Sequence, residues 1–239
     1  MVENLNRQLE FCNFEAYGSG VKSYDQYCAV ARALDAVGDR WVLLIVRELL
    51  ALGPSRYSDL KRGLPGIASN LLAERLKSME AEGLVERREA PAPISAAVYE
   101  LTPRGHALED VLRALTRWGL PDMASGPSAT DAVQPQWTAL FAGLTLADNL
   151  PAGKQITMGV HTGDASVRVT LGQAGYAIER GPDGDVDVTL SGPAHLVGGM
   201  LSGLLTPPEA AQLGLEIDGR AELLTDLVDP THLQTGAQS

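Results

Sequence analysis

The chain has 239 residues, of which 45% are hydrophobic and 5% aromatic, and it carries a formal net charge of −11. This length allows two domains of ordinary size or one large one, and the composition suits a globular core built mostly from aliphatic residues. No apolar run approaches the roughly 18 residues that a membrane-spanning helix needs, and the N-terminus lacks the basic start and apolar core of a secretory signal.

The cysteines and histidines form no metal-ligand pattern. Cys12 and Cys28 are not spaced as CxxC, and the four histidines are far apart in the sequence. A disulfide framework and a cysteine-based zinc site are therefore excluded. We expect no metal, no cofactor and a cytoplasmic location, since unpaired cysteines suit a reducing compartment.

The charges are distributed unevenly between the two halves. Residues 1–120 contain 15 Lys and Arg against 16 Asp and Glu, whereas residues 121–239 contain 4 against 14. Within residues 54–88 the balance is reversed, with 7 basic against 5 acidic residues. The first half can therefore present a basic surface, while phosphates would be repelled by the second.

The first half has helical periodicity followed by a hairpin pattern. Residues 1–22 are polar and are predicted to form a flexible arm. The segment "RWVLLIVRELLAL" is apolar nearly all round, so we expect it to be the buried centre of its domain, with Asp39 as the N-cap. The order of elements predicts a winged helix-turn-helix domain over 23–120. The predicted elements are helices over 27–37, 40–52, 56–64 and 69–82, strands over 84–90 and 97–102, and a helix over 104–118.

The second half changes period after a linker. Residues 121–136 are rich in Pro, Gly, Ser and Ala and predict the linker. Alternating apolar residues then predict an antiparallel sheet with one buried face, and helices beside it make an α+β domain over 137–230, followed by a flexible tail over 231–239. The predicted elements are a helix over 137–147, strands over 154–162, 165–173, 176–181 and 186–191, helices over 192–205 and 207–214, a strand from 215, and a helix near 220–228.

The helix predicted over 69–82 has the properties of a DNA-recognition helix. Leu72, Leu76 and Met79 can hold it against the domain, while its other face is small enough to approach base edges, where Asn70 can pair with adenine. Six neutralised phosphates per protomer would give a log–log salt slope of roughly −5. A solvated helix of an interaction domain is the alternative, and Arg75 could equally be a structural ion-pair partner. The predicted DNA-contacting residues are Arg56, Ser58, Lys61, Arg62, Ser69, Asn70, Ala73, Glu74, Arg75, Lys77, Arg87 and Arg88.

The stretch "YCAVARALDAVGDRWVLLIVRELLALGPSRYSDLKRGLPGIASNLLAERLKSMEAEGLVERR", with the later "VYELTPRG", resembles the HxlR-type branch of winged-helix bacterial regulators across about residues 27–118. This resemblance implies a one-component transcription regulator, which we expect to be a repressor. It also implies a homodimer, formed by the first and last helices of the domain, that binds two half-sites of palindromic double-stranded DNA. Two departures matter. Ala68 occupies a position where such regulators often have a capping Ser, so we expect Ser69 to cap, and the wing tip "PISAA" lacks an Arg for the minor groove.

The second half resembles the sterol-carrier-protein fold over about residues 137–228, through its alternating strands, "DVTLSGPAHLVGGMLSG" and "LEIDGRAELLTDLVD". That fold implies a hydrophobic tunnel between sheet and helices for an apolar ligand. Ser166, His161 and Asp164 lack a nucleophile elbow, so we predict that the protein is not an enzyme. An apolar stripe could line the tunnel or simply fill a core, and it consists of Leu196, Val197, Met200, Leu201, Leu204 and Leu205.

Three functional hypotheses remain open from the sequence. In the main one, the second domain of a DNA-binding regulator either senses an apolar small molecule or stabilises the dimer. In the second, the protein is an apolar-ligand carrier whose first domain serves only for dimerisation. In the third, Cys28 is a redox switch, against the alternative that it is an ordinary buried cysteine with no basic neighbour.

Overall fold

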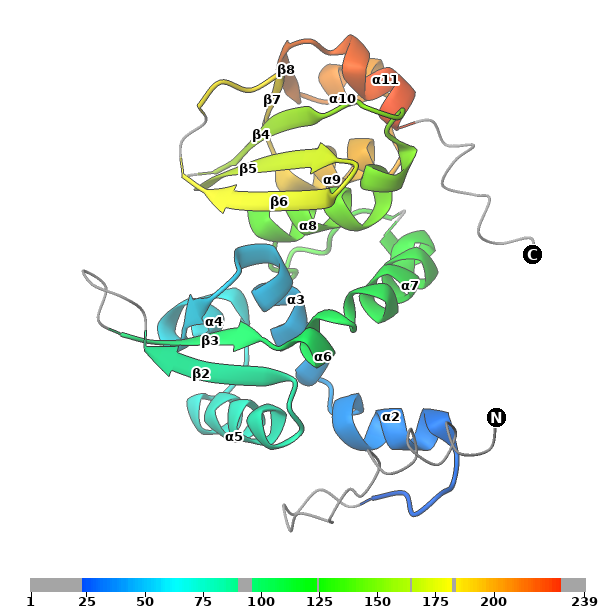
Figure 1. Ribbon diagram of the computed structural model, residues 1–239. Helices are drawn as coiled ribbons and strands as arrows, with labels where there is room; N and C mark the ends of the chain where they lie inside the picture. Colours follow the sequence, from blue (N-terminus) through cyan, green and yellow to red (C-terminus); the bar gives the residue numbers. More distant parts are fainter. Residues whose placement is uncertain (1–22, 90–95, 124, 164, 182–183, 229–239) are drawn as a thin grey trace.

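The protein is described here by a computed structural model, which covers residues 23–89, 96–123, 125–163, 165–181 and 184–228. A helical region with a small sheet lies beside a second region with a larger sheet (Figure 1). The predicted arm over 1–22, the predicted tail over 231–239 and most of the predicted wing tip lie outside the described residues.

The first region is a winged helix-turn-helix, as the sequence predicts. Its sheet has three strands in the order β1-β3-β2, not the two of the predicted hairpin, because the two-residue strand β1 pairs antiparallel with β3. A strand of two residues is too short for alternation to reveal it. The elements are α2 (Ala29–Val37), α3 (Val42–Leu52), β1 (Ser55–Arg56), α4 (Tyr57–Gly63), α5 (Ser69–Ala81), β2 (Val85–Glu89), β3 (Ala97–Leu101), α6 (Pro103–His106) and α7 (Glu109–Gly119).

The helix predicted over 104–118 is divided into α6 and α7. Thr102 caps α6, since its hydroxyl accepts a hydrogen bond from the Gly105 amide at 3.1 Å and donates one to the Gly83 carbonyl at 2.5 Å. Gly105 lies so close to the carbonyl of Leu84 that a Cβ would overlap it. This short helix is therefore fixed to the start of the wing, and the chain changes direction before α7 begins.

The second region is an α+β domain with a five-stranded sheet in the order β6-β5-β4-β7-β8. The prediction of a wholly antiparallel sheet is wrong, because β7 runs parallel to β4, with Val160 opposite Leu190. Alternation reports which face of a strand is buried but not its direction, and the next strand after the edge strand β6 is β7 on the far side of β4. The elements are η2 (Leu120–Met123), α8 (Pro135–Leu146), η3 (Ala147–Asn149), β4 (Ile156–Thr162), β5 (Ala165–Gly172), β6 (Gly175–Arg180), β7 (Val188–Ser191), α9 (Ala194–Leu201), α10 (Pro207–Gln212), β8 (Glu216–Gly219) and α11 (Glu222–Leu227).

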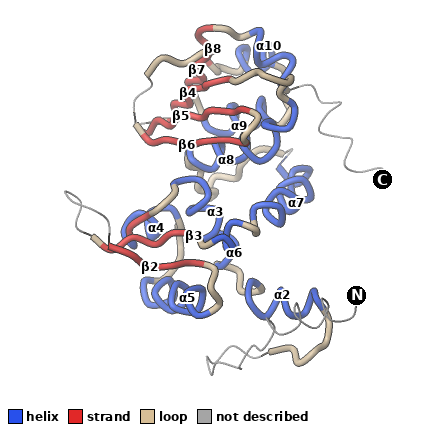
Figure 2. The backbone as a smooth tube through the Cα atoms, viewed as in Figure 1, coloured by secondary structure: helices blue, strands red, loops and turns tan. Residues whose placement is uncertain are grey.

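Helix α8 lies between the two regions and belongs to both cores. It packs against β5 and β6 on one side and against α3 and α7 on the other (Figure 2). Leu140 and Leu144 join the core of the winged helix-turn-helix, whereas Ala142 and Leu146 join that of the second region. Both faces of the helix are therefore buried, which explains why its sequence is apolar nearly all round. Among the described residues, no helix is long and apolar enough to cross a membrane.

Candidate nucleic-acid interface

Helix α5 has one buried and one exposed face. Leu72, Leu76 and Met79 are at most 1% exposed and anchor it in the first core. Because residues three and four apart share a helix face, the remaining positions form one continuous outer surface. The exposed residues of this surface are Ser69, Asn70, Ala73, Glu74, Lys77, Glu80 and Ala81. The predicted face of small and hydrogen-bonding residues is thus assembled on one side of the helix.

The turn before α5 is held by two hydrogen bonds to backbone carbonyls. The Tyr57 hydroxyl donates to the carbonyl of Ser69 at 2.6 Å, and the Lys61 ammonium donates to the carbonyl of Ile67. Lys61 therefore braces the turn as well as carrying charge. The expectation that Ser69 caps the helix is wrong: the N-cap position is Ala68, whose methyl group cannot accept a hydrogen bond, and Ser69 is the first residue inside α5.

Two of the predicted cations are held in ion pairs at or beside α5. The Nε of Arg75 lies 3.0 Å from Asp39 Oδ2, its Nη1 lies 3.0 Å from Glu74 Oε1, and the side chain is only 19% exposed. Arg75 thereby ties α5 to the residues that precede α3, which matches the structural alternative for this residue. Arg62 is exposed and pairs with Asp59 at 3.2 Å on α4.

The basic pair on the wing points to two different faces of the sheet, because consecutive strand residues alternate. Arg88 pairs with Glu100 of the neighbouring strand. Arg87 lies on the other face, where it lowers the pKa of Tyr99, although burial is the larger influence and raises that pKa overall. The negative charge of Glu80 on α5 also raises the pKa of Tyr99, so Arg87 lies near the C-terminal half of α5.

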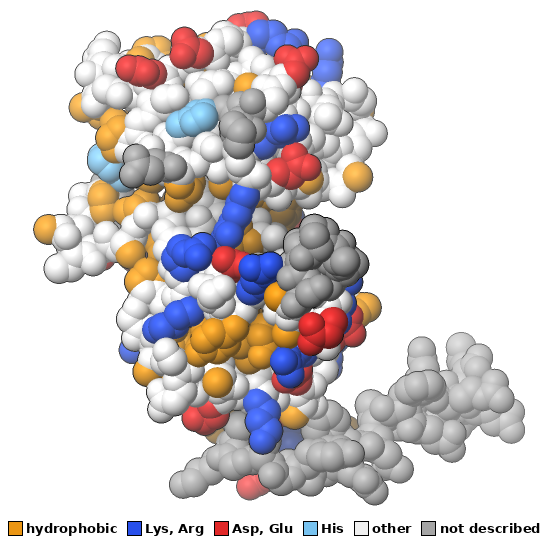
Figure 3. Space-filling view, turned by 90° about the vertical axis from the view of Figure 1, so that its left-hand side faces the viewer, with side chains coloured by type: hydrophobic (Ala, Val, Ile, Leu, Met, Phe, Trp, Pro, Cys, Tyr) orange, Lys and Arg blue, Asp and Glu red, His pale blue; other side chains and the backbone are white. Residues whose placement is uncertain are grey.

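Exposed cations extend beyond α5 itself. Arg56 and Arg87 are exposed cations outside α5, and Lys77 on α5 and Ser58 on α4 are exposed as well. On the face that Figure 3 shows, Lys and Arg side chains are spread over the winged helix-turn-helix and the junction with the second region. The local excess of positive charge in residues 54–88 is thus present at the surface of a chain that is acidic overall.

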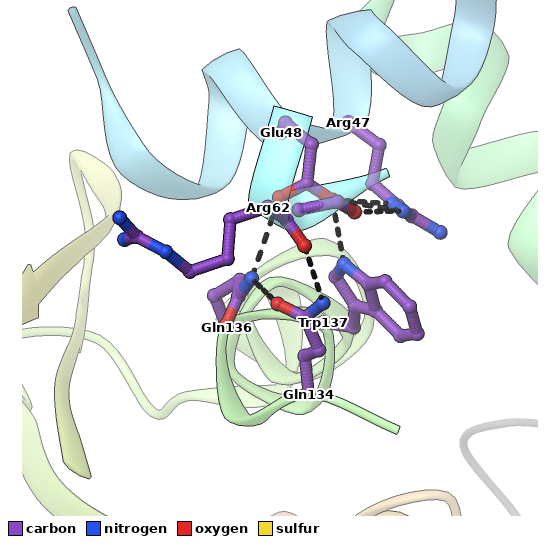
Figure 4. Close-up of polar contacts among 7 residues, drawn as sticks. Arg47, Glu48, Arg62, Gln134, Gln136 and Trp137 are labelled. Atoms are coloured by element: carbon purple, nitrogen blue, oxygen red, sulfur yellow. Dashed lines mark hydrogen bonds and ion pairs between the residues drawn. The ribbon is translucent and has the colours of Figure 1, made fainter. Parts of the chain in front are cut away.

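Sequence reasoning missed a buried carboxylate at the junction of the two regions. Glu48 of α3 is fully buried, and its Oε1 accepts hydrogen bonds from Trp137 Nε1 at 2.5 Å and from Arg47 Nε and Nη2 at 3.1 and 2.8 Å (Figure 4). Gln136 Nε2 lies 3.4 Å from the other carboxylate oxygen. A charged pair inside an otherwise apolar helix was the available signal, since a buried charge requires partners.

The junction also reaches the helix that precedes α5. Gln134 Nε2 donates to the carbonyl of Arg62 at 3.1 Å, and Arg180 of β6 lies 3.8 Å from Asp59. Both contacts join the second region to α4. A shift of the second region would therefore act on the element that positions the outer face of α5.

Cys28 is exposed and lies at the N-cap position of α2. The backbone amides of Ala31 and Val30 lower the pKa of its thiol below the ordinary value, because amide groups at a helix N-terminus stabilise a thiolate. The cysteine is thus not the buried residue that the alternative supposed. Cys12 lies outside the described residues.

The predicted ligand stripe is divided between core and surface. Four of its residues, Leu196, Val197, Met200 and Leu201, are buried in the second core, whereas Leu205 is partly buried and Leu204 is exposed. Ser166 donates to the carbonyl of Gly181, and Asp164 lies outside the described residues. No group of three or more potential metal ligands occurs among the residues that the structure describes.

A family model for HxlR-like helix-turn-helix proteins matches residues 36–125. The HTH-type transcriptional regulator YvaP of Bacillus subtilis (strain 168), itself uncharacterized, is 39% identical over 87 residues, which cover 36% of this chain and 80% of YvaP. The chain belongs to the HxlR-like helix-turn-helix family. A second relative of this HxlR-like protein is the HTH-type transcriptional regulator YodB of the same organism, 36% identical over 86 residues, or 36% of this chain and 76% of YodB. The match to the solved structure of YodB in its reduced form covers 43% of this chain and 96% of the YodB chain, with 33% identity and a TM-score of 0.36.

Proposed function

We propose that the protein is a DNA-binding transcriptional regulator that reads its operator with α5. The observation that carries this proposal is the exposed, small-residue face of α5, anchored from behind by buried leucines, in a chain of the HxlR-like family. A helix of this kind fits the major groove, in which side chains reach base edges. The relatives named above are described as transcriptional regulators, which supports the same function.

The exposed residues divide into those that read bases and those that meet phosphates. Asn70 presents an amide that can donate to and accept from adenine, and Glu74 can accept from a cytosine amino group. Lys77 and Arg87 are exposed cations that can contact the backbone on either side. About four neutralised phosphates per protomer, fewer than the six that the sequence suggested because Lys61 and Arg88 are otherwise engaged, give a log–log salt slope of roughly −4 per protomer.

We further propose that the regulator is a homodimer formed by α2 and α7. Helices α2 and α7 both lie on the right-hand side of the molecule in Figure 1. Both carry exposed apolar side chains, and Tyr27, just before α2, and Trp118 of α7 are 106% and 79% exposed. Large apolar side chains exposed in this number support an interaction site at these helices. A twofold dimer matches a palindromic operator, and occupation of promoter DNA would make the protein a repressor. The proposed dimer face consists of Tyr27, Val30, Leu34, Val111, Leu115 and Trp118.

We assign residues 23–120 to DNA binding and dimerisation, 121–136 to a linker, and 137–230 to a domain of sterol-carrier type. The order of helix, strands, helices, strand and helix supports the last assignment. In this regulator the second domain either senses an apolar small molecule or stabilises the dimer.

The proposal is tested by gel-shift titration with the DNA upstream of the protein's own gene. Full-length protein is expected to form a specific complex that weakens steeply with salt, and Asn70→Ala should weaken it about tenfold or more. Gln173→Ala removes an exposed amide from the second domain and is the matched control, expected to leave binding unchanged. Equal binding of specific and scrambled DNA, or equal effects of the two variants, would contradict the proposal. Tight binding of apolar ligands without any DNA affinity would instead favour the carrier function.

A further inference from the structure

A cavity of about 640 Å³ lies where the two regions meet. Its walls come from α7, from η2 and the segment that follows it, from α8 and from α9. This volume is in the range of sites that hold small molecules, which are typically about 300–1,000 Å³ and mostly apolar. Apolar side chains predominate in the lining, and those used below are Leu112 and Leu115 of α7, Leu140 and Trp137 of α8, and Leu196 and Leu205 beside or on α9.

The wall formed by α9 contains a glycine that keeps space open. Gly198 lines the cavity, and a Cβ built on it would meet no described atom within 4 Å. Glycine is among the least favoured residues inside a helix, so its place in the middle of α9 gives the helix no intrinsic advantage. The position therefore accepts a larger side chain without a clash at Cβ, and such a side chain would fill the cavity.

One arginine is among the described residues that line the cavity. Arg47 lines the cavity, and its guanidinium lies over the Trp137 ring at 4.1 Å from the centroid. Two of its nitrogens donate to Glu48, while the third points away from that carboxylate (Figure 4). Guanidinium groups bind carboxylates and related anions with defined geometry. Desolvation lowers the pKa of Arg47, but the guanidinium keeps its charge because its ordinary pKa is so high.

The other charged side chains of the lining are exposed. Asp122 and Asp131 belong to the segment between α7 and α8, and His195 is on α9. Water screens exposed charges much more than it screens partly buried ones. Arg47, with its side chain 22% exposed, is thus the least screened charge in the lining.

We propose that this cavity is the effector site of the protein and that its ligand is a small amphipathic acid. The apolar body packs against α7, α8 and α9, and the anionic group lies on Arg47. This site differs from the tunnel expected from the sequence, because it lies between the domains and not inside the second one.

The site acts directly on the proposed dimer. Leu112 and Leu115 of α7 line the cavity, and Leu115 also belongs to the exposed dimer face on the same helix. A ligand that shifts α7 therefore changes how the two protomers meet, and hence the spacing of their recognition helices. This regulatory step rests on the proposed DNA-binding function, whereas ligand binding itself does not.

Binding is tested on the full-length protein with two fluorescent probes of nearly the same shape. One is 8-anilinonaphthalene-1-sulfonate, which is anionic, and the other is N-phenyl-1-naphthylamine, which is neutral. We expect both to bind with one site per protomer and the anionic probe to bind at least tenfold more tightly. Gly198→Phe should weaken both by at least tenfold, while Gly198→Ala, the matched control, should change either by less than threefold.

The role of Arg47 needs a variant that does not leave the buried Glu48 carboxylate without a positively charged partner. The double variant Arg47→Met/Glu48→Gln removes both charges together, and Glu48→Gln alone is its control. We expect the double variant to lose the preference for the anionic probe and to bind the neutral probe within threefold of the wild type. An unchanged preference would overturn the assignment of Arg47.

Further outcomes separate the site from the proposed function. Probe binding that Gly198→Phe leaves unaffected would overturn the site. A probe affinity that falls as the protein concentration is raised and dimers form would also overturn it, since a second copy of the chain would then fill the cavity. If the site exists, the saturating anionic probe should change operator affinity at least fivefold in wild type and not in Gly198→Phe. Probe binding as expected in a wild-type protein that binds no DNA, or whose operator affinity the probe leaves unchanged, would uphold the site and overturn the regulatory step.

Discussion

Replacing Trp137 by Phe removes one hydrogen bond to a carboxylate that the fold buries completely. Trp137 Nε1 donates to Glu48 Oε1 at 2.5 Å, and Glu48 is 0% exposed. A hydrogen bond to a charged group contributes about 1.5–3 kcal/mol, and phenylalanine retains an aromatic ring against Arg47. We therefore expect Trp137→Phe to lower the free energy of unfolding by about 2 kcal/mol. In the background of Glu48→Gln the same substitution removes only a neutral hydrogen bond and should cost about 0.5–1.5 kcal/mol.

The four proteins of this double-mutant cycle are compared by urea unfolding, followed by far-ultraviolet circular dichroism at one protein concentration. With a denaturant slope of about 3 kcal/mol/M, a loss of about 2 kcal/mol moves the midpoint by about 0.7 M. The coupling energy between the two sites should be about 1 kcal/mol. An equal cost of Trp137→Phe in both backgrounds would show that the ring packs at the junction without a bond to the carboxylate.

Four further changes test the interface, the junction and the thiol. Asn70→Ala should reduce specific operator affinity by about 1–3 kcal/mol and relax the preference at one base pair, measured by gel shift against a panel of single-base variants. Lys77→Gln should weaken binding to all sequences alike and make the log–log salt slope shallower by about 1 per protomer, whereas a change in base preference would contradict a phosphate contact. Gly63→Ala, which ordinarily would stabilise a helix, should cost about 1–3 kcal/mol in thermal unfolding because its Cβ overlaps a buried carboxylate. Alkylation of Cys28 by iodoacetamide, in a Cys12→Ser background, should have its pH midpoint lower than that of free N-acetylcysteine, because a lowered pKa places the thiolate at lower pH.

Local periodicity was sufficient to locate the helices that make up the winged helix-turn-helix. The segment over 40–52 is apolar nearly all round and corresponds to α3, and the three apolar anchors predicted over 69–82 are the buried residues of α5. Features that depend on distant partners were not accessible. Glu48 has one partner, Arg47, beside it in the sequence, but its other hydrogen-bond donor, Trp137, is 89 positions away, so the sequence near Glu48 does not show that this carboxylate joins the two regions.

The candidate ligand residues show the same limit. An apolar stripe on α9 and after it is equally consistent with a core and with a cavity, and the outcome depends on which neighbour each residue faces. Val197 faces its own sheet, while Leu204 and Leu205 face the space beside α7. The direction of β7 likewise depends on where the chain crosses the sheet, which alternation cannot encode.

The shared position of α8 limits how the molecule can be divided for experiments. A fragment that ends inside the segment 121–134 would lose Leu140 and Leu144 from its core and would leave the carboxylate of Glu48 without Trp137. Such a fragment would expose an apolar patch next to a carboxylate that has lost one of its hydrogen bonds, and it would tend to aggregate instead of binding DNA. The smallest usable DNA-binding fragment therefore extends through Leu146. A fragment of the second region would need α8 as well, so the twelve residues of this helix would have to be present in both fragments.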